Sequence, residues 1–196
     1  MKQSKEHIVV AVTGASGSVY ALGLIKWLVD NGYPVELIAS DTGKKVFEYE
    51  TGKRFSADTL TTEKDLITIH DNDNLFSPLS SGSYKFSKII IVPCSMGTLG
   101  RIATGSGTKL IERVADVALK ERRRLVIVPR ETPLNTIHLE NMLKLSSAGA
   151  IILPAIPAFY HKPKTIDDMV SFIVSKILDA VDIPNNLYKR WTGKNN

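Results

Sequence analysis

Residues 8–17 read IVVAVTGASG, and this stretch decides the fold that the rest of the chain must complete. An apolar run rich in β-branched residues ends at a small, flexible turn that carries hydroxyl groups, and residues 18–30 follow with the apolar spacing of a helix. The pair Asn31-Gly32 is a typical helix end. A strand, a glycine-containing turn and a helix in this order predict an anion site, because free N–H groups and the helix dipole attract negative charge.

The alternation of strand and helix continues along the chain. Apolar runs without polar alternation, as expected for strands buried on both faces of a parallel sheet, occupy residues 8–12, 35–39, 89–92, 125–128 and 150–153. Helical patterns are predicted over residues 18–30, 110–120, 137–145 and 167–181. Residues 52–87 are polar and mixed, and predict only loops and a short helix. We therefore expect one α/β domain over residues 1–196, a Rossmann-like or flavodoxin-like three-layer sandwich with a mainly parallel sheet.

Three of the predicted strands end in a proline, namely Pro93, Pro129 and Pro154. Proline lacks the N–H that a central strand needs, so each is expected to mark the point where its strand leaves the sheet. In a parallel sheet all strand endings share the edge at which ligands bind. The polar or reactive segments that follow the five strands are residues 13–17, 40–41, 94–98, 130–131 and the loop to residue 160.

Composition narrows the class of protein. The chain has 196 residues, of which 43% are hydrophobic and 23% charged, as in a well-buried globular domain. It has no apolar run of transmembrane length and no signal-peptide pattern, so we expect no membrane partner and a cytoplasmic location. A single cysteine and scattered histidines predict neither a disulfide framework nor a metal site. The net charge of +5 is spread along the chain, so no nucleic-acid partner is expected.

The first turn allows more than one kind of anion. A dinucleotide fingerprint needs three glycines, and Gly14 and Gly17 supply only two of them. A mononucleotide fits better, because Thr13 and Ser16 add hydroxyl donors and residues 95–98 form a second hydroxyl-rich turn on the same edge. The alternative is that both are only tight turns between a strand and a helix, which favour the same residue types.

Candidate acid–base groups are Glu50, Glu131 and Tyr160, and candidate cations for a phosphate are Arg113, Lys120, Arg130 and Lys176. The pair Arg130-Glu131 is the sharpest, because arginine binds phosphate with two N–H groups and an adjacent carboxylate can move a proton. A structural ion pair is the alternative. Cys94 could be a nucleophile, but without an identifiable base a buried, small apolar role is the better interpretation.

Several longer motifs make the pattern specific. They are TGASG at 13–17, SSGS at 80–83, PCSMGTL at 93–99, IERVADVALKERR at 111–123, LVIVPRETPLNTIHLENMLKLSSAGAIILPAIPAFYHKP at 125–163 and RW at 190–191. In this combination the chain resembles the UbiX-type flavin prenyltransferases over nearly its whole length. The resemblance implies an enzyme that joins the dimethylallyl group of dimethylallyl phosphate to N5 and C6 of reduced FMN. The product, prenylated FMN, would pass to a partner decarboxylase of the UbiD type.

The resemblance also implies roles for individual residues. FMN would be held by Gly14, Ala15, Ser16, Ser40, Ser95, Met96, Gly97, Thr98 and Arg130. The prenyl phosphate would be bound by Ser81, Gly82, Arg113, Lys120, Arg130, Tyr160 and Lys176. Ser16 would lie beside the reacting flavin, and Glu50 and Glu131 would assist proton movements. Family members are homo-oligomers, often dodecamers, with shared active sites, and the tail over about 183–196 would pack on a neighbouring subunit.

Two departures from the family pattern and two rival functions remain. Lys176 stands where arginine is common, and Gly107-Thr108-Lys109 replaces a stretch that usually carries Asp-Asn or Asn-Asn. An FMN-dependent decarboxylase of the peptidyl-cysteine type would want a histidine shortly after the first glycine-rich turn, and residues 18–30 contain none. A non-catalytic flavin carrier would share the FMN turns but would not need Lys120, Glu131 and Tyr160 together.

Overall fold

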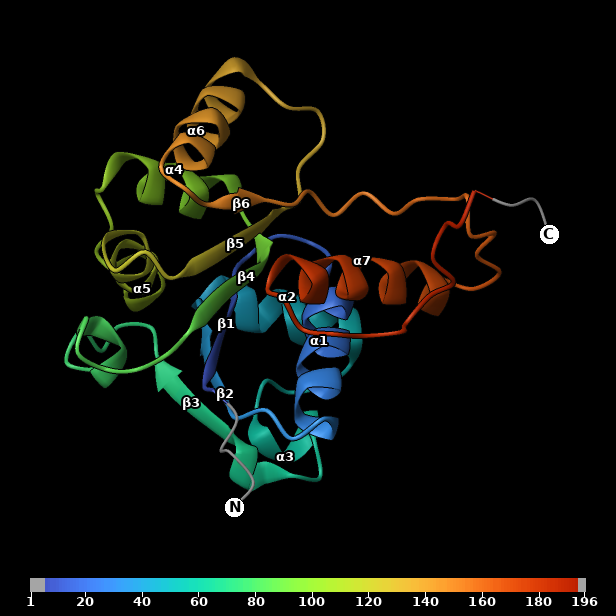
Figure 1. Ribbon diagram of the computed structural model, residues 1–196. Coiled ribbons are helices and arrows are strands. Elements are labelled where there is room, and N and C mark those ends of the chain that lie inside the picture. Colours follow the sequence, from blue (N-terminus) through green and yellow to red (C-terminus); the bar gives the residue numbers. More distant parts are fainter. Residues whose placement is uncertain (1–5, 194–196) are drawn as a thin grey trace.

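Six parallel strands form the centre of the computed structural model, which describes residues 6–193 (Figure 1). The strands are β1 (Ile8–Val12), β2 (Val35–Ala39), β3 (Ile67–Asp71), β4 (Lys88–Cys94), β5 (Arg124–Pro129) and β6 (Ile151–Ile152). Their order across the sheet is β3-β2-β1-β4-β5-β6, and every neighbouring pair is parallel. This is the strand order of the Rossmann fold, in which the chain reverses its direction across the sheet between β1 and β4. The expected α/β sandwich is therefore confirmed.

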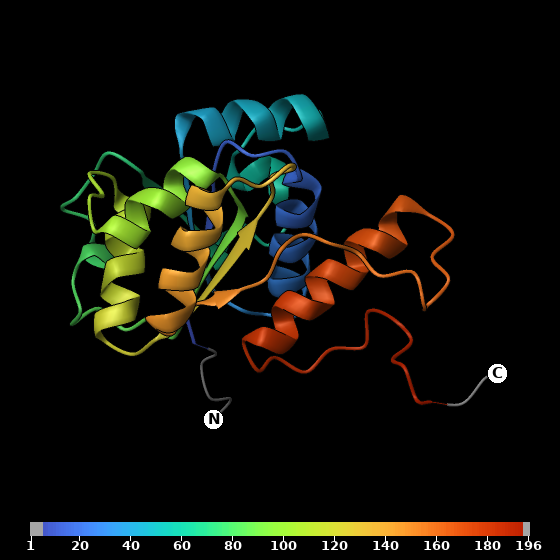
Figure 2. The ribbon, with the colours of Figure 1, turned by 90° about the horizontal axis from the view of Figure 1, so that it is seen from above.

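Helices cover both faces of the sheet. They are α1 (Ser18–Asp30), α2 (Asp41–Thr51), α3 (Ala57–Leu60), α4 (Met96–Thr104), α5 (Leu110–Lys120), α6 (Thr136–Ser147) and α7 (Ile166–Ala180), with short 3₁₀ helices η1 (Lys64–Leu66) and η2 (Pro78–Ser80). Helices α1, α2, α3 and α7 lie on one face, and α4, α5 and α6 on the other (Figures 1 and 2). No helix within residues 6–193 is long and apolar enough to span a membrane.

Alternation along the buried strands divides the core into two parts. In β1, Val10 and Val12 pack with Leu24 and Leu28 of α1, whereas Val9 packs on the opposite face with residues of α4 and α5. The side chains of β1 are fully buried. Burying one such side chain contributes roughly 1.5–3 kcal/mol, so the central strands are firmly held and can position the turns that follow them.

The structure corrects the predicted strand ends and adds one strand. β4 runs through Pro93 to Cys94, and β5 includes Pro129, which pairs with Cys94 after an irregularity in β4. The prolines remain in the sheet because their carbonyl oxygens still accept hydrogen bonds: Pro93 from the Thr13 N–H at 3.2 Å, and Pro129 from the Ala155 N–H. β3 was not predicted, since its side chains at the sheet edge are half-buried or exposed and lack an apolar run.

One acidic side chain, Glu36, is buried at the start of β2. His7 Nδ1 and His70 Nε2 donate to its carboxylate at 2.7 and 2.6 Å, and the Tyr84 hydroxyl donates at 2.9 Å. Burial alone would raise the pKa of Glu36, but the hydrogen bonds from His70, His7 and Tyr84 outweigh this effect and lower the pKa to about 2. The ionised form of Glu36 therefore stabilises the folded state.

We expect this stabilisation to disappear in acid. A pKa near 2 in the folded state, against 4.5 in the unfolded chain, corresponds to a contribution on the order of 3 kcal/mol above pH 4.5. Because the folded pKa is the lower one, the contribution is lost as the pH falls from about 5 towards 2. Denaturant unfolding of the native chain and of Glu36→Gln should therefore differ most at neutral pH and converge at low pH. A constant difference across this range would contradict the prediction.

Candidate active site

Two turns meet at the carboxyl edge of the sheet, between β1 and β4. The Thr13 hydroxyl donates to the Pro93 carbonyl at 2.9 Å and accepts from the Ser95 N–H at 2.7 Å, so it ties the end of β1 to the end of β4. Ser95 then caps α4, and its side chain accepts from the Thr98 N–H. The expectation that Thr13 offers a free hydroxyl to an anion is wrong, because this buried hydroxyl is engaged within the protein. Thr13 therefore has a structural role.

The N-terminus of α1 already has an anionic partner. One carboxylate oxygen of Glu50, at the end of α2, accepts from the N–H groups of Gly17 and Ser18 at 3.0 and 2.8 Å. Gly17 adopts a left-handed conformation with φ of 110°, which favours glycine there. Burial would raise the pKa of Glu50, but the Ser16 hydroxyl and these amides lower it. Glu50 thus occupies the helix terminus that the sequence assigned to an external anion.

A pocket of about 430 Å³ opens beside this terminus. Ser16, Gly17, Tyr20 and Glu50 line one side of it, and Arg130 the other. Burial raises the pKa of Tyr20, and the nearby positive charge of Arg130 acts in the opposite direction. The structure therefore brings together Ser16, Glu50 and Arg130, which the sequence predicted for one site.

A second, apolar pocket of about 310 Å³ shares Arg130 with the first. It follows β5 and β6, and Glu131, Leu134, Met142 and Ile156 line it. The Glu131 carboxylate accepts from the Thr132 N–H at 3.1 Å, and its side chain is exposed. A carboxylate beside apolar walls can transfer a proton without being locked in an ion pair.

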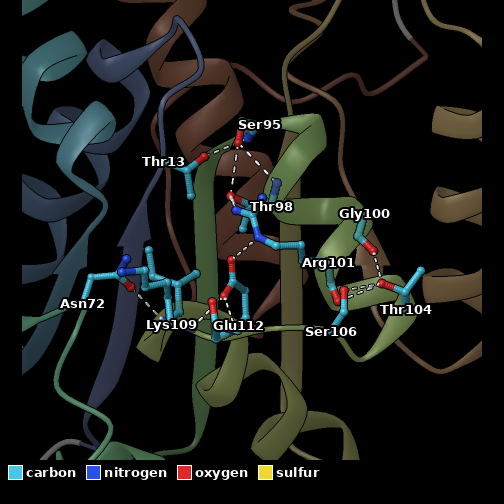
Figure 3. Close-up of polar contacts among 12 residues, drawn as sticks. Thr13, Asn72, Ser95, Thr98, Gly100, Arg101, Thr104, Ser106, Lys109 and Glu112 are labelled. Atoms are coloured by element: carbon cyan, nitrogen blue, oxygen red, sulfur yellow. Dashed lines mark hydrogen bonds and ion pairs between the residues drawn. The ribbon is translucent and has the colours of Figure 1, made fainter.

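A third pocket, of about 220 Å³, lies between the start of α2 and helices α4 and α5. It contains Ser40 and Thr98, as well as two cations that the sequence reasoning missed, Arg101 and Lys109. Figure 3 shows the polar contacts on this side: Arg101 Nη2 donates to the Thr98 hydroxyl at 3.3 Å, and Arg101 Nε to Glu112 at 2.6 Å. Arg101 could have been found from its spacing, because it lies one helical turn after Thr98.

Buried Glu112 holds this arrangement in place. Its second oxygen accepts from the N–H groups of Thr108 and Lys109 at 3.0 and 2.9 Å, at the N-terminus of α5. Lys109 also forms an ion pair with Asp73. Lys109 therefore adds a cation to the pocket, and Glu112 caps the N-terminus of α5.

The other predicted site residues lie elsewhere in this chain. Ser81, Gly82, Arg113 and Lys120 gather along η2 and α5, and Lys120 ends α5 just before β5 begins at the opposite edge of the sheet. Tyr160 lies on the segment between β6 and α7, which runs away from the sheet (Figure 1). The hydrogen bond between its hydroxyl and that of Tyr188, at 3.4 Å, raises the pKa of Tyr160. Lys176 is exposed on α7.

Burial and spacing bear on two further candidates, Cys94 as a nucleophile and a site for a metal ion. Cys94 is buried, and burial raises the pKa of its thiol to about 12, which agrees with a structural role and not with a nucleophile. Among residues 6–193, no three histidine, cysteine, aspartate or glutamate side chains are placed to hold a metal ion.

Comparison with known proteins places the chain in a family. A family model described as Flavoprotein matches residues 1–178. Flavin prenyltransferase UbiX from Methanocaldococcus jannaschii is 50% identical, over 94% of this chain and 97% of that protein. The crystal structure of AnUbiX (PadA1) with FMN and dimethylallyl pyrophosphate is 40% identical and superimposes with a TM-score of 0.91, covering 97% of this chain and all of that one.

A dodecameric FMN-dependent UbiX-like decarboxylase from Escherichia coli O157:H7 gives a TM-score of 0.88 at 39% identity, with 95% of this chain and 100% of that chain covered. The residues matched by the family model, 1–178, include the turns after β1 and β4, all three pockets and the segment that carries Tyr160. The chain belongs to the flavoprotein family and, within it, to the UbiX-type flavin prenyltransferases.

Proposed function

We propose that this protein joins the dimethylallyl group of dimethylallyl phosphate to N5 and C6 of reduced FMN and so makes prenylated FMN. The observation that carries the proposal is the meeting of Ser16, Glu50 and Arg130 around one pocket, which shares Arg130 and Ala155 with the apolar pocket of Glu131. Structural similarity over 97% of the chain to a protein crystallised with FMN and dimethylallyl pyrophosphate supports it.

Residues at the carboxyl edge of the sheet, which we call the rim, fit a flavin mononucleotide. Hydroxyl groups of Ser40 and Thr98 and the cations Arg101 and Lys109 suit its phosphate, and the third pocket collects all of them. Three carboxylates line the same pocket, and Glu112 and Asp73 are paired with Arg101 and Lys109, so a phosphate would have to share these cations. Glu50 already holds the N-terminus of α1, so the phosphate belongs at this pocket rather than at α1. The remaining residues predicted for FMN lie on the two turns that border the site: Gly14, Ala15, Ser16, Ser95, Met96 and Gly97.

The chemistry divides between the flavin and the protein. Reduced FMN supplies electron-rich N5 and C6, while the protein must stabilise the departing phosphate and move protons. Arg130 can neutralise the phosphate with two N–H groups, and Glu131 beside it can move a proton. Ser16 can orient the flavin edge, with Glu50 holding the Ser16 turn in place through the amides of α1.

The phosphate-binding residues distant from the rim are assigned to neighbouring subunits. Ser81, Arg113 and Lys120, and separately Tyr160 and Lys176, lie apart from Arg130 in one chain, so a homo-oligomer with shared sites would unite them. Large apolar side chains are exposed on α6 and after β6, as expected for subunit contacts: Ile137, Leu139, Leu143 and Ile156. The tail over about 183–196 would pack on a neighbour.

Two further assignments follow from the family and stay predictions. The product would be transferred to a UbiD-type decarboxylase. The protein would act in the cytoplasm.

The reaction can be tested by mass. The protein is incubated without oxygen with reduced FMN and dimethylallyl phosphate. The flavin is then released, and its molecular mass is measured by mass spectrometry. We expect a gain of one dimethylallyl unit that requires both protein and donor; replacing the monophosphate by the diphosphate identifies the preferred donor. Unchanged flavin mass with both donors would disprove the proposal. Binding of preformed prenylated FMN without its synthesis would favour a carrier, and carbon dioxide release from a peptidyl cysteine would favour a decarboxylase.

A further inference from the structure

A tight turn between η2 and β4, residues 81–84, lies against the end of α5. The Tyr84 N–H donates to the Ser81 carbonyl at 3.3 Å and closes the turn. The hydroxyls of Ser81 and Ser83 are exposed and lie 2.8 Å apart. A methyl group on Gly82 would come within 2.8 Å of the Lys120 Nζ atom and closer still to the carboxylate of Glu121, which forms an ion pair with Lys120, so the turn is in close contact with this pair. The turn and the Glu121 carboxylate together therefore surround the Lys120 ammonium group, and a phosphate would have to replace Glu121 as its partner.

Arg123 fixes the turn from one side. Its Nη1 donates to the Tyr84 carbonyl at 2.9 Å and its Nη2 to the Gly82 carbonyl, so one planar guanidinium joins two backbone oxygens. The same group lies over the ring of buried Phe86, with Cζ 4.3 Å from the ring centre. Carbonyl oxygens repel a phosphate, and occupying both of them with a cation makes the turn more favourable for an anion.

Tyr84 fixes the turn from the other side. Its hydroxyl donates to Glu36 at 2.9 Å, and that buried carboxylate is itself held by His7 and His70. The Tyr84 side chain thus attaches the turn to Glu36 near the start of β2, a strand that pairs with β1. None of these residues lines the three pockets, so a function that they share beyond stabilising the fold would lie at the turn.

We propose that Tyr84 and Arg123 are positioning residues, which hold the Ser81–Ser83 hydroxyl groups beside Lys120 in the arrangement that binds the phosphate of the prenyl donor. The proposal rests on the proposed function, in which Ser81, Gly82 and Lys120 bind that phosphate. Neither positioning residue touches the reacting atoms. Without them the turn would still exist, but its hydroxyl groups would no longer be directed to one place.

Two conservative variants test this idea in the full-length protein. Tyr84→Phe removes only the hydroxyl that reaches Glu36, and Arg123→Lys keeps the charge but cannot join two carbonyl oxygens. We expect each variant to raise the KM for dimethylallyl phosphate roughly fivefold or more, as for the loss of one hydrogen bond, with kcat nearly unchanged. The Kd for FMN should also be unchanged, because the flavin pockets lie at the opposite edge of the sheet.

Controls separate positioning from simple loss of stability. Tyr49→Phe and Arg54→Lys change the same residue types at exposed positions and should leave the KM unaltered. Thermal unfolding of every variant shows whether the fold persists, and calorimetry with dimethylallyl phosphate reports binding even if no turnover occurs. Wild-type turnover in the same assay tests the proposed function separately. An unchanged KM and Kd for the donor in both variants, or a fall in kcat and FMN affinity instead, would overturn the inference.

Discussion

Replacing Glu131 with glutamine is expected to slow the formation of prenylated FMN by about 10²-fold or more while FMN binding stays intact. Glutamine has the same shape and can still accept from the Thr132 N–H, so the loop after β5 keeps its form. It cannot accept a proton at neutral pH, however, and proton transfer near the leaving phosphate and the flavin is the function assigned to this carboxylate. The effect should therefore appear in kcat rather than in the affinity for either substrate.

The measurement is a single turnover of enzyme-bound reduced FMN, followed by flavin absorbance and mass after rapid mixing with dimethylallyl phosphate. Glu140→Gln is the matched control, since Glu140 is an exposed carboxylate on α6 that lines none of the three rim pockets. Turnover of Glu131→Gln at the native rate would remove this residue from the mechanism. A weaker Kd for FMN with normal turnover would instead make Glu131 a flavin-binding residue.

The buried strands and helices could be predicted from the sequence because burial requires a periodic spacing of apolar residues. β1, α1 and α5 agree with the predicted bounds, since apolar residues there face the core on both sides of a strand or along one stripe of a helix. α2 has no such apolar pattern, because only Gly43 and Phe47 are buried in it and its other residues are half-buried or exposed. β3 was missed for the same reason, because pairing with β2, not burial, makes it a strand.

The site was predictable as far as sheet topology determines it. Strand ends of a parallel sheet must share one edge, so Ser16, Ser95 and Arg130 could be placed together. The contact of Glu50 with the first amides of α1 could not, because it joins elements that the chain brings together only by folding. The turn expected to bind a phosphate is instead bound by a carboxylate of the protein itself, and the phosphate site that we propose lies one strand away at α2.

The distance between Lys120 and Glu131 has the most direct functional consequence. β5 lies between them, and a strand of six residues is about 20 Å long, so within one chain these side chains cannot contact the same phosphate. If both act on one substrate, Lys120 must come from another subunit. Lys120→Ala and Glu131→Gln should each be nearly inactive alone, yet oligomers that contain both variants should regain activity.

The fraction of native activity that the mixed oligomers should regain follows from how the subunits combine. In a one-to-one random mixture, a site that takes each residue from a different subunit is intact with a probability of about one quarter, so about a quarter of native activity is expected. Co-expression of the two variants with different affinity tags, followed by tandem purification, provides the mixed oligomers. Arg130→Ala with Glu131→Gln is the matched control: both residues line the same pocket of one chain, and no mixture of these variants can place two native residues there together. Equal inactivity of both mixtures would show that Lys120 and Glu131 do not serve a common site across a subunit boundary.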